Sequence, residues 1–242
     1  MNRIAIIAAM PGELKPLVRG WSHTHASGVD LWRWSYRNQF EEPCEWIAAC
    51  AGAGVDAAAR AFAAAEACGP VDCVISTGWV GALGDDYQPG KAYWVAGAID
   101  LRTGERFASE EPSNLWLVTS PRVADAAEKQ RLATAYGAAL VDMEAAAVAR
   151  LAAMRGLPFL CLKGVSDGFR ERLPDLNRFL SPDGRFRLAH FVLFALFRPW
   201  CWPALRRMGE NSTKAAQAIR ASLLANLDPS GELRNRNGYP SR

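Results

Sequence analysis

Carboxylate side chains follow three of the apolar runs in this 242-residue chain, at places where a strand is expected to end. Glu13 follows the first run, residues 142–144 (Asp-Met-Glu) follow another, and residues 166–167 (Ser-Asp) end a third. Ligands in open α/β sheets bind beyond the carboxyl ends of the strands, so these groups are expected to meet at one site. Carboxyl groups gathered there could exchange protons with a bound molecule or stabilise a positive charge that develops on it.

Each of these residues also has a purely structural interpretation. Glu13 could complement the dipole of the helix that it opens, and Asp142 could cap the helix behind it. Gly78 and Gly81, in a glycine-rich segment after the middle strand, could simply permit a tight turn. Asp167 could be a turn residue before a glycine. The order of these residues along the chain, rather than any single one, therefore carries the argument for a site.

Short β-branched runs alternate with helix-forming segments. Strands are expected at residues 3–9, 31–36, 44–51, 71–77, 91–95, 115–119 and 158–165. Helices are expected from about residue 13 and at 51–67, 122–136 and 143–155, with turns at 38–43 and 77–81. The alternation predicts one α/β domain over residues 1–226, with a central mixed, largely parallel sheet flanked by helices. Residues 227–242 are turn formers and charges without periodicity, and we expect a disordered tail there.

The composition is that of an ordinary soluble protein, with half of the residues hydrophobic, 22% charged and a net charge of +3. No basic block has the density of a nucleic-acid-binding groove, so no nucleic-acid partner is expected. Among the six cysteines, Cys50, Cys73 and Cys161 lie in apolar runs and are predicted to be buried in a reducing compartment. No metal-ligand spacing and no secretory cleavage region are recognisable, which predicts a cytoplasmic protein without a metal or cofactor.

The apolar segment at residues 188–205 has several interpretations. Its uncharged part ends at Arg198 and is shorter than the roughly 20 residues that a membrane span needs. The favoured interpretation is a core helix packed on the sheet. A helix that covers a hydrophobic substrate, a partner subunit or a membrane surface is the alternative.

Three collinear strings carry a family resemblance: VDMEAAAVA at residues 141–149, GLPF at 156–159 and VSD at 165–167. Together they resemble the core of methylthioadenosine/S-adenosylhomocysteine nucleosidases and related nucleoside phosphorylases. Residues 6–13 and 76–83 are similar to the opening and the glycine-rich turn of the same family. The resemblance covers roughly residues 1–226 and implies the nucleoside phosphorylase-like α/β fold.

The resemblance implies roles for five residues. Asp167 would be the general acid or hydrogen-bond donor at purine N7, which makes the base a better leaving group. Ser166 would orient Asp167 or touch the base, and Met143 would pack against the sugar. Glu144 would accept hydrogen bonds from the ribose hydroxyls and stabilise the developing cation. Glu13 would act as general base on the attacking water.

The glycine-rich turn and the late strand contribute further expected contacts. Gly78 and Trp79 occupy the family's substrate-binding turn. Phe159 is expected beside the base, with the alternative that residues 158–159 (Pro-Phe) simply begin the buried strand. Relatives that hold phosphate usually carry Ser or Thr where this chain has Trp79, and the Gly-x-Pro-x-Arg opening of phosphorylases is also missing. Both departures favour water over phosphate as the nucleophile. Lys163 stands where many relatives have arginine.

The segment at residues 115–142 is shorter than in the methylthioadenosine enzymes. In this respect, and in its LPD, SPDGR and closing helix strings, the chain is more similar to the hopanoid-associated phosphorylase branch, which is thought to release adenine from adenosylhopane. The apolar helix at 188–205 would suit such a lipid-tailed substrate. Since relatives form dimers to hexamers, a homo-oligomer is expected.

The expected function is hydrolysis of the N-glycosidic bond of a 5′-substituted purine, specifically adenine, nucleoside, with release of the free base. A phosphate-dependent nucleoside phosphorylase and an adenosylhopane-cleaving enzyme of hopanoid biosynthesis are alternatives. A non-catalytic nucleoside-binding protein is an alternative of a different class, because Trp79 at the nucleophile end of the site could block the attacking water. A membrane-peripheral protein is another.

Overall fold

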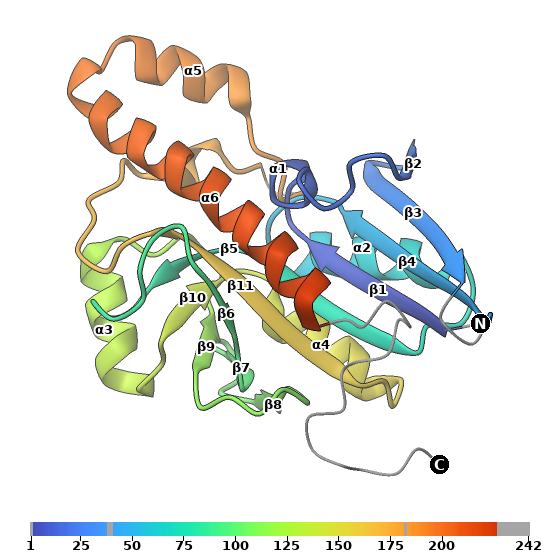
Figure 1. The fold of residues 1–242 in the computed structure, drawn as a ribbon. Helices are drawn as coiled ribbons and strands as arrows, with labels where there is room; N and C mark the ends of the chain where they lie inside the picture. Colours follow the sequence, from blue (N-terminus) through green and yellow to red (C-terminus); the bar gives the residue numbers. More distant parts are fainter. Residues whose placement is uncertain (1, 38–40, 182, 227–242) are drawn as a thin grey trace.

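The computed structural model describes residues 2–37, 41–181 and 183–226. Within them, an eleven-stranded mixed sheet lies between helices, which confirms the predicted single α/β domain (Figure 1). The expected disordered tail at 227–242 and residues 38–40 of the expected turn lie outside the described residues. Strand order along the main path is β2-β3-β4-β1-β5-β10-β9-β7-β8, and β11 pairs with β5 and β6.

Most neighbouring strands in the central part of the sheet run parallel, except that β10 runs antiparallel to β5, and further antiparallel pairs lie toward the edges. β11 follows β5 along almost its whole length, while β1 and β10 pair with successive parts of β5. This arrangement gathers the carboxyl ends of β1, β10 and β11 around β5. The strands are β1 (Asn2–Ala8), β2 (Ser22–Ala26), β3 (Val29–Arg37), β4 (Pro43–Cys50), β5 (Cys73–Ala82), β6 (Ala92–Trp94), β7 (Gly97–Asp100), β8 (Arg106–Ala108), β9 (Trp116–Thr119), β10 (Leu140–Asp142) and β11 (Phe159–Asp167).

Helices cover both faces of the sheet, and α6 crosses one face along β11 (Figure 1). α2 and α4 pack against each other and against the sheet strands. The helices are α1 (Pro11–Leu14), α2 (Val55–Glu66), α3 (Ala126–Tyr136), α4 (Ala145–Met154), α5 (Leu188–Leu196) and α6 (Trp202–Asn226), with 3-10 turns at Leu176–Phe179 and Pro199–Cys201.

Side-chain alternation along β1 explains why the sheet has a core on each face. Successive strand side chains point to opposite faces. Ile4 and Ile6 therefore join the cluster that contains Ile219 of α6, while Ile7 joins the cluster of α2 and α4. Both faces of the central strands are covered in this way, which is why these strands read as continuous apolar runs.

The glycine-rich segment at residues 77–81 is not the turn that the sequence predicted, because β5 continues through it to Ala82. Gly78 adopts a positive φ of 128° and bends the strand without ending it. The pairing with β11 carries on past this bend, with Lys163 opposite Gly78 and Gly164 opposite Trp79. The strand ladder therefore outweighs the local turn preference of the glycines.

The helix after β10 begins later than predicted. Asp142 belongs to β10, and Glu144 is the residue at the N-cap of α4. The Asp142 carboxylate still serves the helix, since its Oδ2 accepts a hydrogen bond from Ala145 N at 2.9 Å. The strands β2, β7 and β8 were not predicted, because they are short and two of them are largely exposed. Of the cysteines, Cys50, Cys73 and Cys161 are buried, as predicted.

The prediction of a core helix at residues 188–205 is wrong. α5 has no buried residue; Leu196, Phe197 and Trp200 are 61%, 73% and 72% exposed. Its inner side rests on Phe179, whose ring centroid lies 5.4 Å from that of Phe191. Among the described residues no single helix has the length and apolar character of a membrane span, although the bent pair formed by Leu188–Leu196 and residues 199–225 passes the same test.

Candidate active site

Glu13 lies in α1, just beyond the end of β1, and its carboxylate is held by backbone N–H groups. Oε2 accepts from Ala9 N at 2.8 Å and Met10 N at 2.9 Å, and Oε1 accepts from Trp79 N at 2.8 Å. Burial raises the pKa of Glu13, although these donors act in the opposite direction. A Cβ at Gly78 would lie 2.9 Å from Oε1, so only glycine leaves room for this carboxylate.

Glu144 faces the same space from the start of α4. Its Oε1 accepts a hydrogen bond from Gly54 N at 2.6 Å, and its Oε2 accepts one from Met143 N at 3.2 Å. Burial and the nearby charge of Asp142 raise the pKa of Glu144 to about 8. A carboxyl group with such a pKa exchanges its proton close to neutral pH.

Ser166 and Asp167 end β11 at an irregularity in its pairing with β5. Val165 is opposite Val80 and Asp167 is opposite Gly81, so Ser166 is the extra residue of a bulge. The Ser166 hydroxyl lies 2.7 Å from Asp167 Oδ1 and 3.2 Å from the Val80 carbonyl oxygen. The bulge thus places the hydroxyl where it orients the Asp167 carboxyl group.

Two buried lysines accompany these carboxyl groups. Lys163 Nζ lies 2.9 Å from Asp142 Oδ2 and 3.0 Å from Ser76 Oγ, beneath the pocket rather than in its wall. Its charge lowers the pKa values of Glu13 and Glu144 and so offsets part of the increase that burial causes. The second lysine, Lys129 of α3, forms an ion pair with Asp167.

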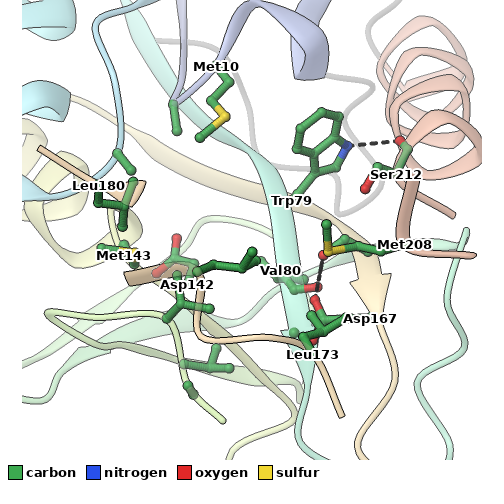
Figure 2. Close-up of a pocket in the computed structure, with 18 of the residues that line it drawn as sticks. Met10, Trp79, Val80, Asp142, Met143, Asp167, Leu173, Leu180, Met208 and Ser212 are labelled. Carbon is green, nitrogen blue, oxygen red and sulfur yellow. Dashed lines mark hydrogen bonds between the residues drawn. The ribbon is translucent and has the colours of Figure 1, made fainter. Parts of the chain in front are cut away.

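A cavity of about 290 Å³ brings most of the predicted site residues together (Figure 2). In Figure 2, Asp142 and Met143 lie on one side of Val80 and Asp167 lies on the other. Gly78 does not line the cavity and stands behind Glu13. The predicted residues that do line it are Glu13, Trp79, Met143, Glu144, Ser166 and Asp167.

Phe159 does not reach this cavity, and its expected contact with a base is wrong. Phe159 begins β11, whereas Ser166 and Asp167 end it. A strand of that length separates its two ends by about 26 Å at ~3.3 Å per residue. Phe159 is 5% exposed and belongs to the core cluster on the α2 and α4 face. Its side chain therefore has a packing role.

Trp79 lies at the wall of the cavity that faces α6. Its indole Nε1 donates a hydrogen bond to the Ser212 carbonyl oxygen of α6 at 2.9 Å (Figure 2). On the other side, a Cβ at Gly12 would lie 2.9 Å from the ring atom Cη2. The indole thus connects β5, α1 and α6, while its backbone N–H serves Glu13.

Several wall residues were not among the predicted site residues. Lys129 had no sequence signal, because a lysine on a helix is normally a solvated surface residue. An apolar wall comes from the segment after β11 and from the C-terminal helices, part of which the 188–205 segment had indicated. Its members are Leu173, Leu176, Leu180, Phe186, Phe191 and Met208.

The arrangement combines Glu13, Glu144 and Asp167 with an apolar enclosure, and a fourth carboxylate of the wall, Asp142, is paired with Lys163. Glu13 and Glu144 can accept protons or hydrogen bonds from a polar ligand, and Asp167 with Lys129 can serve a second polar group. The sulfur-bearing side chain of Met143 supplies an apolar surface between them. Such a site suits proton-coupled chemistry on a flat, partly polar molecule.

Comparison with known proteins bears on the fold and on the family resemblance. A family model described as "Phosphorylase superfamily" matches residues 115–181. No curated protein sequence matches the chain. Among solved structures, a Helicobacter pylori 5′-methylthioadenosine/S-adenosylhomocysteine nucleosidase aligns with a TM-score of 0.68 and 16% identity, covering 93% of this chain and 97% of that one.

Two further structures give the same result. The Streptococcus pneumoniae methylthioadenosine/S-adenosylhomocysteine nucleosidase has a TM-score of 0.66 at 20% identity and covers 93% and 98% of the two chains. The Helicobacter pylori futalosine hydrolase has a TM-score of 0.65 at 16% identity and covers 92% and 98%. At these identities the likeness establishes a shared fold. With the family match, it confirms the resemblance to the nucleoside phosphorylase and nucleosidase superfamily.

Proposed function

We propose that this chain, which shares its fold with nucleosidases of the phosphorylase superfamily, hydrolyses the N-glycosidic bond of a 5′-substituted adenine nucleoside. The observation that carries the proposal is that Glu13, Glu144 and Asp167 line one cavity although they come from the ends of three different strands or their following helices. Solved relatives of the same fold are nucleosidases and a hydrolase by name.

In the proposed reaction the purine lies next to Asp167, which polarises or protonates N7. The ribose lies between Met143 and Glu144, whose ionised carboxylate accepts the sugar hydroxyls and stabilises the oxocarbenium-like transition state. Glu13 takes the proton of the attacking water. Burial raises the pKa of Glu13, which makes its carboxylate a better proton acceptor for this step.

Water is the nucleophile in this proposal because the cavity wall is rich in carboxyl groups. Where Glu13 and Glu144 are ionised, as the proposed mechanism requires, they would repel a phosphate dianion beside them, because like charges repel strongly in a buried site. The cations of the wall are Arg122 and Lys129, and Lys129 is paired with Asp167. Trp79 supplies no hydroxyl donor, and its backbone N–H is already bonded to Glu13. A strict requirement for phosphate would instead favour a nucleoside phosphorylase.

An apolar 5′ substituent is the finer part of the proposal. The cavity wall beyond the carboxyl groups consists of aliphatic and aromatic side chains from residues 173–191 and from α6. Such a wall binds hydrocarbon better than a charged tail, because burial of apolar area is favourable. This supports a lipid-tailed nucleoside, such as the adenosylhopane of hopanoid biosynthesis, as a candidate substrate.

Peripheral contact with the cytoplasmic face of a membrane would bring such a substrate to the cavity. The outer side of α5 and the following turn expose Leu193, Leu196, Phe197 and Trp200. Aromatic and aliphatic side chains of this kind favour the headgroup boundary of a bilayer. A second copy of the chain could cover the same side chains, and a homo-oligomer therefore stays a competing prediction.

The proposal is tested by assaying free adenine from methylthioadenosine, S-adenosylhomocysteine and adenosylhopane, with and without phosphate. We expect adenine from at least one substrate without phosphate. Tight nucleoside binding without any product over hours would contradict the enzyme and support a non-catalytic binding protein.

A further inference from the structure

Lys129 is a buried lysine in the wall of the cavity that the proposed mechanism does not yet use. It lies near the start of α3, and the residue is only 1% exposed. Its Nζ contacts Asp167 Oδ2 and donates a hydrogen bond to the Gly168 carbonyl oxygen at 2.8 Å. The ammonium group therefore has partners on the very residue expected to act on the purine.

The surroundings of Lys129 are shaped to admit its side chain. A Cβ at Gly81 would lie 2.9 Å from Lys129 Cε and 3.2 Å from Val141 Cγ1. The missing side chain of Gly81 thus leaves the space through which the lysine reaches Asp167. Removing an ammonium group from water is costly unless the charge is paired, and Asp167 provides that pairing.

The ion pair changes how Asp167 can act. A carboxyl group that contacts an ammonium group is held as a carboxylate, which accepts hydrogen bonds but has no proton of its own to give. The purine N7, however, is also an acceptor. A donor proton must therefore come from a neighbour. The Ser166 hydroxyl and the Lys129 ammonium group both contact Asp167, and the ammonium group is the stronger acid of the two.

We propose that Lys129 is a positioning residue for Asp167 and that its ammonium group stores the proton that Asp167 delivers to the purine. The inference rests on the proposed nucleosidase function. An N–H bond of Lys129 breaks and an O–H bond forms on Asp167, and this proton passes to N7 as the glycosidic bond breaks and its electron pair moves into the base. Water adds to the sugar carbon and gives its proton to Glu13, and solvent then returns a proton from Glu13 to the neutral lysine.

The test compares Lys129→Ala, Lys129→Arg and wild type for adenine release, with kcat and KM determined separately. We expect Lys129→Ala to lower kcat about 100-fold, the size of a general-acid contribution, with a much smaller change in KM. Added ethylamine should occupy the vacated space and raise the kcat of Lys129→Ala at least tenfold. Added guanidine should not raise it. Lys129→Arg keeps the charge but should stay slow, because a guanidinium group does not release its proton.

Three controls make the result decisive. Arg131→Met removes an exposed charge from the same helix and should leave kcat unchanged. Rescue of Lys129→Ala by ethylamine is the second control, because an amine does not restore a structural defect elsewhere in the chain. Thermal unfolding shows whether each variant is folded.

Wild-type kcat in Lys129→Ala, or full rescue in Lys129→Arg, would overturn the inference while leaving the proposed function intact. Absence of adenine release from the wild type would overturn the proposed function itself. If Lys129→Ala does not fold, Lys129→Met fills the space without a charge, and the same loss of kcat is expected.

Discussion

Three carboxyl groups share one cavity, but their immediate neighbours differ. Glu13 accepts hydrogen bonds from backbone N–H groups, Glu144 lies near another carboxylate, and Asp167 contacts an ammonium group. In a buried site such differences decide which group holds a proton and which holds a charge. The division of roles between base, cation stabiliser and acid follows from these contacts rather than from residue type, because all three are carboxylic acids.

Replacement of Asp167 by asparagine tests the acid side of the site. The amide retains the size of the side chain but cannot pass a proton, so kcat should fall at least 100-fold. Substrate affinity should change little, because the amide can still form hydrogen bonds to the base. Steady-state adenine release measures both effects, and Asp85→Asn, at an exposed ion pair, is the matched control. Full turnover in Asp167→Asn would remove Asp167 from the mechanism.

The pKa of Glu144 predicts the pH dependence of activity. With a pKa of about 8, Glu144 is largely protonated at pH 6, whereas the proposed role requires the carboxylate. We therefore expect kcat/KM to rise as the pH increases toward 8, and the raised pKa of Glu13 acts in the same direction. Rate measurements between pH 5 and 9 check this, and a flat profile would contradict it.

The free energy of unfolding should fall as the pH rises, whereas kcat/KM should increase. A glutamate whose pKa is about 8 in the folded state and about 4.5 in the unfolded state stabilises the fold fully below pH 4.5. This contribution is lost as the pH rises through 8. Glutamine does not titrate, so between pH 5 and 9 the melting temperature of Glu144→Gln should fall less than that of the wild type. Thermal scans compare the two slopes; equal slopes would show that Glu144 titrates normally.

At the scale of elements, the cavity exists because α6 is fastened over the end of β5. The Trp79 indole supplies that connection through Ser212, and α6 in turn places Met208 in the wall. Gly12 allows the ring to pass by having no side chain. Trp79, which the sequence had suggested as an obstacle to the attacking water, thus connects β5 with α1 and α6.

Replacement of Trp79 by phenylalanine should loosen this connection. The lost hydrogen bond and smaller ring should cost about 1–2 kcal/mol, which lowers the melting temperature by about 2–8 °C in a chain of this size. KM should rise more than kcat falls, because the wall moves while the carboxyl groups stay. Trp200→Phe, at a side chain that is 72% exposed, is the control and should have a smaller effect. If KM and the melting temperature do not change, the Trp79 indole does not hold α6 in place over β5.

The outer side of α5 predicts binding to lipid vesicles. Leu193 and Leu196 are 57% and 61% exposed, so replacing both by serine should leave the fold intact. Co-sedimentation with anionic liposomes should fall several-fold, because less apolar area enters the bilayer boundary. Leu224→Ser, at an exposed leucine of α6, is the control. Phe191 is unsuitable because its ring packs on Phe179. Retained binding together with loss of self-association would identify α5 as a subunit interface.

At the scale of the whole molecule, the sequence predicted the α/β domain because buried parallel strands and their helices leave strong periodic patterns. It also predicted that Glu13, Glu144 and Asp167 would meet. For Glu13 and Asp167 the reason is that β1 and β11 run parallel to β5, whereas β10, which precedes Glu144, runs antiparallel to β5 and reaches the site from the opposite direction. Phe159 was misplaced because a motif gives proximity along the chain but not the end of the strand on which a residue lies. Lys129 was missed because its burial depends on Gly81, a residue nearly fifty positions away in another element.

The measurement that tests the central claim most directly is the fate of the oxygen that joins the sugar. Purified protein is given an adenine nucleoside in H₂¹⁸O buffer that also contains phosphate, and the sugar product is analysed by mass spectrometry. Hydrolysis predicts a free sugar that carries one ¹⁸O, formed at the same rate with and without phosphate. A sugar 1-phosphate, or a rate that depends on phosphate, would contradict the account.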